Sequence, residues 1–214
     1  MHLRITTIAA TCDPPQGTVV LLHGWGGNVQ DLAAIAQYLR LPQLQYYLPS
    51  APFPHPYNPM GSMWYGFPDG YQFSPEDPFQ PGDDLTTSRH LLTDWLQTLP
   101  EKTGIPLDRT LLAGFSQGGA MTLDVGLALP LAGLLVMSGF LHAVPAGDRQ
   151  PKASILMVHG RQDAVVPLAV ARYARDCLQS LGATLAYHEL DMGHEIDPEA
   201  LQLMRQFIQA RLDL

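Results

Sequence analysis

Short apolar and β-branched runs alternate along this chain with segments of helical periodicity, and this alternation limits the fold more than any other feature. Such an order is typical of a mostly parallel sheet flanked by helices. Strands are predicted at residues 3–8, 18–22, 44–48, 109–113, 133–137, 154–158 and 184–189. Helices are predicted around residues 32–39 and 85–96, where apolar residues recur every three or four positions, and at 117–127, 168–181 and 198–211.

The chain of 214 residues has no composition break or long linker, which predicts one domain over residues 1–214. One stretch interrupts the alternation: residues 49–81 hold nine of the 19 prolines and eight of the 18 aromatic residues. We expect a long ordered loop at 50–81, without regular structure and close to a functional site. The alternative is a surface connector whose aromatic side chains only fasten it to the body.

The charge and cysteine content exclude several classes of partner. A net charge of −8, with 12 Lys and Arg residues that form no cluster, argues against nucleic-acid binding. Cys12 and Cys177 lie far apart, which favours two reduced thiols and a cytoplasmic protein. The apolar run at residues 5–10 is too short for a secretory signal, and no run reaches the roughly 18 residues of an integral membrane span.

A G-x-S-x-G pentapeptide at residues 114–118 lies between a predicted strand and a predicted helix. A nucleophile on such a turn needs small neighbours, because strand and helix approach closely while the hydroxyl stays exposed. Ser116 is therefore the candidate nucleophile. The free NH groups at the start of the helix face developing negative charge, so the backbone NH of Gln117 is a candidate oxyanion donor. The pentapeptide alone also fits a tight turn with an incidental serine.

A glycine-rich turn, His23-Gly24-Trp25-Gly26-Gly27, follows the predicted strand at residues 18–22. A backbone NH at such a turn can point into a site, and we predict that Trp25 supplies the second oxyanion donor. His23 is interpreted as a packed structural histidine rather than a base. The glycines alone also fit an ordinary strand-to-helix turn.

An acid and a histidine follow two later strands. Asp163 comes after the strand at 154–158, where its carboxylate can accept a histidine ring NH and hold that ring in place. His194 comes after the last predicted strand and completes the chain order nucleophile, acid, histidine, so it is the candidate general base. Taken alone, Asp163 also fits a helix N-cap and His194 a structural role.

Other acids compete with Asp163. Asp191, Glu195 and Asp197 are sequence neighbours of His194, but neighbours on one tight loop rarely aim at the same ring. Asp148 is the runner-up for the orienting acid. Asp124 is expected on the helix after the nucleophile, in a structural role.

The sequence predicts no metal and no cofactor. The eight histidines show neither H-x-x-x-H nor H-E-x-x-H spacing. The glycines follow neither the dinucleotide G-x-G-x-x-G order nor the phosphate-loop pattern that ends in Gly-Lys.

Five stretches together resemble the phospholipase/carboxylesterase family, which includes acyl-protein thioesterases and small bacterial carboxylesterases. They are residues 22–26, residues 48–52 (Leu-Pro-Ser-Ala-Pro), residues 114–119, the group His159-Gly160 with Asp163 and Val166-Pro167, and Gly193-His194. The resemblance covers nearly the whole chain. It implies an α/β-hydrolase fold without a large cap domain, the catalytic residues Ser116, Asp163 and His194, and an oxyanion hole of the Trp25 and Gln117 NH groups. It also implies a small ester or thioester substrate and, by likeness alone, a homodimer.

The chain departs from the family pattern near the expected pocket. The family's Trp-Phe-Asp resembles Trp64-Tyr65 followed by Gly66, and Gly27 replaces an acid of the glycine-rich turn. Trp25 is larger than the residue common there, and we expect it to narrow the acyl side. The pocket candidates are Phe53, Met63, Trp64, Tyr65 and Val166.

We therefore predict hydrolysis of esters with short to medium acyl chains, through an acyl-enzyme on Ser116. Two alternatives within this chemistry are an acyl-protein thioesterase and a lysophospholipase, both acting on longer chains. A peptidase or a dienelactone-type hydrolase is less consistent, since the latter uses a cysteine nucleophile. An alternative from another class is a noncatalytic ligand receptor on the hydrolase scaffold.

Overall fold

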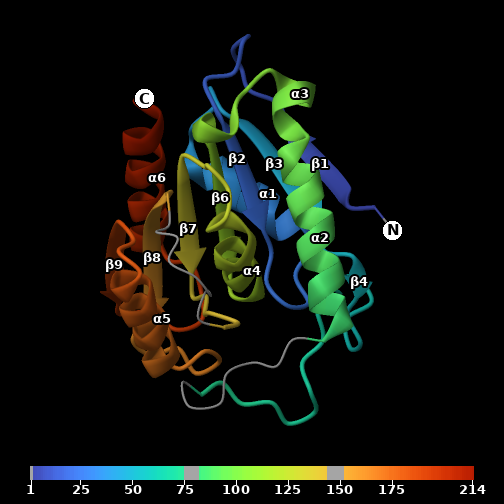
Figure 1. Cartoon of the computed structure of the whole chain (residues 1–214), viewed down its shortest axis with the longest axis vertical. Helices are drawn as coiled ribbons and strands as arrows, with labels where there is room; N and C mark the ends of the chain where they lie inside the picture. The colour runs from blue at the N-terminus through green and yellow to red at the C-terminus, as the bar shows by residue number, and fades with distance from the viewer. Residues whose placement is uncertain (1, 75–81, 144–151) are drawn as a thin grey trace.

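A seven-stranded sheet forms the centre of the computed structural model, which describes residues 2–74, 82–143 and 152–214 (Figure 1). The strands are β1 (Arg4–Ile8), β2 (Thr18–Leu22), β3 (Gln45–Ser50), β6 (Thr110–Phe115), β7 (Gly133–Met137), β8 (Ser154–Gly160) and β9 (Leu185–Leu190). Their spatial order is β1-β3-β2-β6-β7-β8-β9, with β1 antiparallel and every other neighbouring pair parallel. The predicted mostly parallel sheet is confirmed, and six strands end at one common edge.

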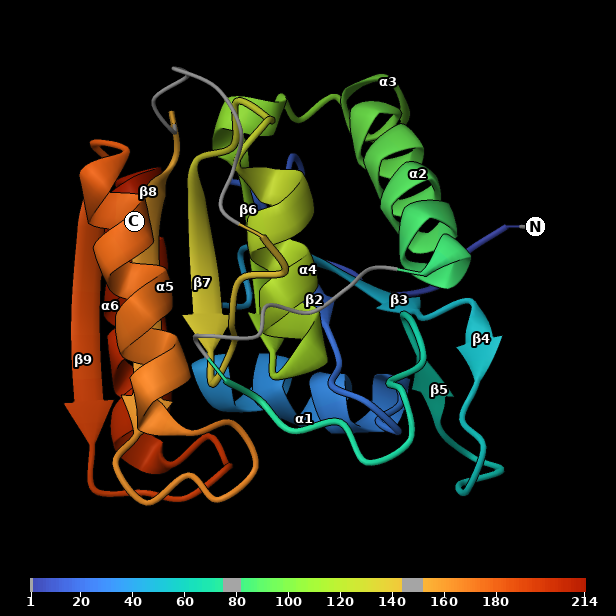
Figure 2. The same ribbon diagram turned by 60° about the horizontal axis from the view of Figure 1, so that its bottom comes forward.

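Helices cover both faces of this sheet (Figure 2). One face carries α1 (Val29–Leu39) and α6 (Pro198–Leu212); the other carries α2 (Asp83–Gln97), α3 (Leu99–Thr103), α4 (Gln117–Gly126) and α5 (Leu168–Ser180). Alternate strand residues serve the two layers, because successive side chains of a strand point to opposite faces. On β2, for example, Val20 and Leu22 pack toward α4, whereas Val19 and Leu21 pack toward α1 and α6.

The predicted strands and helices all occur, with ends displaced by up to three residues. The short helix α3 and the 3-10 turn η1 (Leu107–Arg109) were not predicted, because neither is long enough to show a period. None of the described helices has the length and apolar character that crossing a bilayer requires.

The expectation that residues 50–81 lack regular structure was wrong in one part. β4 (Phe53–Pro54) and β5 (Ser62–Met63) pair as a short antiparallel ladder. The ladder is closed by a backbone hydrogen bond from His55 to Gly61, and the ring Nδ1 of His55 accepts from the backbone NH of Asn58. Two-residue strands joined by such local contacts leave no alternating pattern in the sequence. Residues 75–81 of this loop lie outside the described residues.

Candidate active site

Ser116 occupies the turn between β6 and α4, at the edge where the parallel strands end. Its φ of 53° and ψ of −117° form a strained conformation for a residue with a side chain. The two flanking glycines make the turn fit: a Cβ at Gly114 would overlap the carbonyl of Gly118, and one at Gly118 would overlap the carbonyl of Leu22. The turn is anchored by a hydrogen bond of 2.8 Å from the Ser116 NH to the Met137 carbonyl.

The loop between β9 and α6 brings His194 against this serine. The distance from His194 Nε2 to Ser116 Oγ is 3.0 Å, and the distance from His194 Nδ1 to Asp163 Oδ2 is 2.8 Å. With the proton on Nδ1, the ring donates to Asp163 and accepts from the serine hydroxyl. Three residues from three separate strand ends thus form one continuous hydrogen-bonded chain.

Asp163 is held as an ionised acceptor. Its Oδ1 accepts from the backbone NH groups of Val165 and Val166, at 2.9 and 2.8 Å, while Oδ2 faces His194. Burial, the largest single influence, opposes ionisation, but the hydrogen bonds from His194 and the two NH groups together outweigh it. The pKa of Asp163 therefore lies below its usual value, and the carboxylate stays charged beside the imidazole.

Trp25 and Gln117, the two candidate oxyanion donors, both lie close to Ser116: Gln117 is the first residue of α4, and Trp25 follows Gly24, where an added Cβ would lie 3.3 Å from Ser116 Cβ. Neither NH donates a hydrogen bond within the described part of the chain. The Gln117 NH also belongs to a helix N-terminus, where the helix dipole favours negative charge. The loop that carries Trp25 is fixed by a bond of 2.9 Å from the Gly26 NH to the Ser62 carbonyl.

Two buried side chains join these turns to the loop at 50–81, and sequence reasoning did not identify this role for either of them. The side-chain amide of Gln117 accepts from the Trp64 NH at 2.9 Å and donates to the Tyr65 carbonyl at 2.7 Å. His23 donates from Nδ1 to the Gly24 carbonyl at 2.8 Å and accepts at Nε2 from the Ala51 NH at 3.1 Å. Burial, the main cause, lowers the pKa of His23, so this ring stays neutral and keeps its acceptor.

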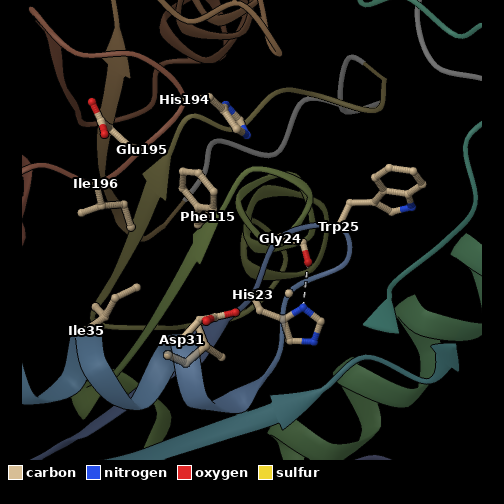
Figure 3. A pocket seen from close by; sticks show the side chains of 11 residues that line it. His23, Gly24, Trp25, Asp31, Ile35, Phe115, His194, Glu195 and Ile196 are labelled. Carbon is tan, nitrogen blue, oxygen red and sulfur yellow. Dashed lines mark hydrogen bonds between the residues drawn. The ribbon is translucent and has the colours of Figure 1, made fainter. Parts of the chain in front are cut away.

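A cavity of about 310 Å³ opens beside His194, on the α1 side of the serine turn (Figure 3). Its apolar wall residues are Leu32 and Ile35 from α1, Phe115 from β6, and Ile196 after the histidine, and Asp31 and Glu195 also line it. Figure 3 shows the Trp25 ring directed away from Phe115, so Trp25 borders the cavity close to its backbone.

The five pocket candidates lie elsewhere, and none lines this cavity. Trp64, Tyr65 and Val166 have no exposed surface, while Phe53 and Met63 are half-buried on β4 and β5. The Trp64 indole NH donates to the His23 carbonyl at 3.0 Å.

Tyr65 takes part in a polar group behind the serine turn. Its hydroxyl lies 2.6 Å from His142 Nε2. Asp124 of α4 lies within 3.7 Å of the other ring nitrogen of His142 and forms a paired contact with Arg89. Asp124 thus has the structural role expected from the sequence.

The competing acids are engaged in other contacts. Asp191 pairs with Arg161 at 2.6 Å, and Asp197 caps α6 by accepting from the Ala200 NH. Glu195 is exposed beside the Gly193 NH. Asp148 lies outside the described residues. Among residues 2–74, 82–143 and 152–214, no group of three or more His, Cys, Asp or Glu side chains is arranged to hold a metal ion.

The chain is similar in sequence and in fold to known esterases and thioesterases. A model of the phospholipase/carboxylesterase family matches residues 3–212. The chain is 30% identical to acyl-protein thioesterase 1 of Neurospora crassa, over 91% of this chain and 86% of that protein. It is 26% identical to acyl-protein thioesterase 1 of Saccharomyces cerevisiae, over 96% of this chain and 97% of that protein. The crystal structure of esterase PE8 superposes with a TM-score of 0.88 at 29% identity, covering 98% of this chain and 99% of that one.

Proposed function

Because the chain belongs to the phospholipase/carboxylesterase family, we propose that it cleaves esters of short to medium acyl chains through an acyl-enzyme on Ser116. Its homologues are esterases and thioesterases, and the protein is a hydrolase of the α/β-hydrolase superfamily. The observation that carries the assignment to Ser116 is the hydrogen-bonded chain from Asp163 through His194 to its hydroxyl, at 2.8 and 3.0 Å.

The reaction begins when His194 takes the Ser116 proton as the hydroxyl oxygen attacks the acyl carbonyl carbon. The tetrahedral oxyanion is stabilised by the NH groups of Trp25 and Gln117, and Asp163 stabilises the imidazolium. His194 then protonates the departing oxygen or sulfur. Water attacks the acyl-enzyme with the same imidazole as base and releases the acid. Loss of one oxyanion donor is expected to lower kcat roughly a hundred- to thousandfold.

The packing of Trp25 supports the preference for short to medium chains. Its ring contacts His55 with ring centroids 4.1 Å apart and Phe67 with centroids 5.9 Å apart, both edge to face. The ring is 40% exposed, and these edge-to-face contacts fix it beside the oxyanion turn, where it takes space from a long acyl chain. The second candidate is a thioesterase or lysophospholipase that acts on longer chains, and the names of the relatives favour it.

The test is hydrolysis of p-nitrophenyl esters and matching thioesters of increasing acyl length, by the wild type and by Ser116→Ala. We expect activity to disappear in the variant and to be highest for short or medium chains. Highest turnover on long chains would favour the second candidate. Equal rates in both proteins, with ligand binding but no labelling of Ser116 by a fluorophosphonate probe, would favour a noncatalytic receptor.

The remaining assignments follow from the sequence and the family. We propose that residues 1–214 form one catalytic domain, that the protein acts in the cytoplasm, and that it pairs as a homodimer. Its substrate is a small ester or thioester, with no cofactor, metal or nucleic acid involved. Analytical ultracentrifugation and limited proteolysis test the assembly and the domain, and fractionation of cells tests the location.

A further inference from the structure

The cavity beside His194 is built from segments that no local sequence motif connects. Asp31, Leu32 and Ile35 come from α1, Phe115 from the end of β6, and the rest of the wall from the loops around Gly24 and His194. Figure 3 shows Phe115, Ile35 and Ile196 around one space, with His194 above it. Its volume of about 310 Å³ suits a small organic group.

We propose that this cavity is the leaving-group subsite, which receives the alcohol portion of the ester and selects uncharged or cationic alcohols over anionic ones. The inference rests on the proposed function and deepens it by naming the substrate class.

Proton transfer decides which part of the substrate enters the cavity. In acylation the bond from Ser116 Oγ to the carbonyl carbon forms, the bond from that carbon to the alcohol oxygen breaks, and the proton on His194 Nε2 passes to the departing oxygen. The departing oxygen must therefore lie next to His194. Three consecutive residues, His194, Glu195 and Ile196, line the cavity, so the alcohol substituent that extends from this oxygen enters it.

The acyl group extends in the other direction. The carbonyl oxygen occupies the space between the Trp25 and Gln117 NH groups, and the alcohol lies on the His194 side. The acyl substituent then extends away from the cavity beside His194.

The composition of the wall determines which alcohols fit. Leu32, Ile35, Phe115 and Ile196 favour apolar groups. Among the described residues of the wall, Asp31 and Glu195 are the only acids, and none is Lys or Arg. A negative field attracts cations and repels anions, although both carboxylates are exposed and therefore partly screened. We expect a preference of a few fold for cationic over neutral alcohols.

The shape of the subsite is tested with two crossed series of esters. One series keeps the butyryl group and changes the alcohol from ethyl to hexyl; the other keeps the ethyl group and lengthens the acyl chain. The value kcat/KM reports acylation, the step in which the alcohol leaves. In Ile35→Trp, the hexyl-to-ethyl ratio is expected to fall at least tenfold, while the acyl-length profile changes less than twofold. Ala34→Trp, at an exposed position of α1 outside the cavity, is the matched control.

Each other result overturns the inference. A changed acyl profile with an unchanged alcohol ratio would make the cavity the acyl site, and no change in either would exclude it from the substrate path. If Ile35→Trp does not fold, Ile35→Ala serves instead, with better turnover of branched alcohols expected. Failure of the proposed function is separate, since the wild type would then show no Ser116-dependent hydrolysis of any ester.

The charge preference is tested with two butyrate esters of nearly equal shape, the choline ester and the neutral 3,3-dimethylbutyl ester. The wild type is expected to favour the choline ester about threefold in low salt, and added salt is expected to reduce this. The double variant Asp31→Asn with Glu195→Gln should bring the ratio close to one, and Asn at position 31 can still accept the bond from the Asn28 NH. A wild-type ratio of one or less would refute the charge preference.

Discussion

Toward α1, the space beside His194 is an open cavity lined by Leu32, Ile35 and Ile196, whereas toward α2 and α4 the side chains of Trp64 and Tyr65 are fully buried. On the open side, the wall residues supply shape and charge. On the packed side, hydrogen bonds from Gln117 connect the neighbouring loop to the first turn of α4. Substitutions on the open side should therefore change selectivity, and those on the packed side should change stability.

The largest expected effect is the loss of kcat in variants of His194 and Asp163, because every ester needs these residues whichever side its groups occupy. His194→Ala should lower kcat about ten-thousandfold or more on every ester, and Asp163→Asn by roughly the same factor, because the tautomer and the base are lost. The double variant should be no slower than His194→Ala alone, since the residues act as a unit. Steady-state kinetics on both ester series measures this. A loss confined to one series would contradict the shared role.

On the packed side, Gln117→Ala removes two buried hydrogen bonds. We expect the free energy of unfolding to fall by about 2–6 kcal/mol, at 1–3 kcal/mol for each bond, and kcat to fall with it. Urea denaturation gives the first quantity. Glu195→Gln is the control on the open side and should stay within about 0.5 kcal/mol of the wild type. Equal losses of unfolding free energy in the two variants would show that the packed side is no more important for stability than the open side.

Protonation of two buried histidines is expected to lower the stability of the fold in mild acid. Burial lowers the pKa of both His23 and His159. In mild acid the unfolded chain therefore binds more protons than the folded protein does. Stability is thus lost as the pH falls below the unfolded value of about 6.5, at up to about 1.4 kcal/mol per pH unit for each ring. The pKa of the Asp163 carboxyl group is also lowered, so its stabilising contribution is lost only in stronger acid.

The measurement is the midpoint of thermal unfolding between pH 7.5 and 5.5. His23→Gln should show a shallower decline than the wild type. His90→Gln, on the exposed surface of α2, is the matched control for loss of a histidine. Equal slopes in the two variants would contradict the role of His23.

The smallest expected effect is that of Tyr65→Phe, which removes one hydroxyl bonded to His142 on the packed side. The free energy of unfolding should fall by about 0.5–1.5 kcal/mol. The kcat on short esters should stay within threefold of the wild-type value. Tyr57→Phe is the control, because Tyr57 is 79% exposed. No difference in denaturant midpoint between these variants would show that the buried hydroxyl contributes nothing.

Much of this arrangement was predictable from local patterns. Apolar runs predicted the parallel strands, and Gly114 and Gly118 predicted a close strand-to-helix turn at Ser116. The short ladder of β4 and β5 was not predictable, because it depends on single contacts such as the bond from His55 to Gly61. The roles of the Gln117 and His23 side chains also left no signal, since their partners lie far along the chain.

The sequence by itself determined the alternation of strands and helices, and the order Ser116, Asp163, His194 at successive strand ends, because periodicity and glycine spacing are local properties. Only the tertiary structure decided that the side facing α1 is open and that the other is packed. The cavity exists because Ile35 of α1 and Ile196 of the histidine loop meet across about 160 residues of chain. Contacts over such separations depend on how whole helices pack on the sheet, which no segment encodes alone.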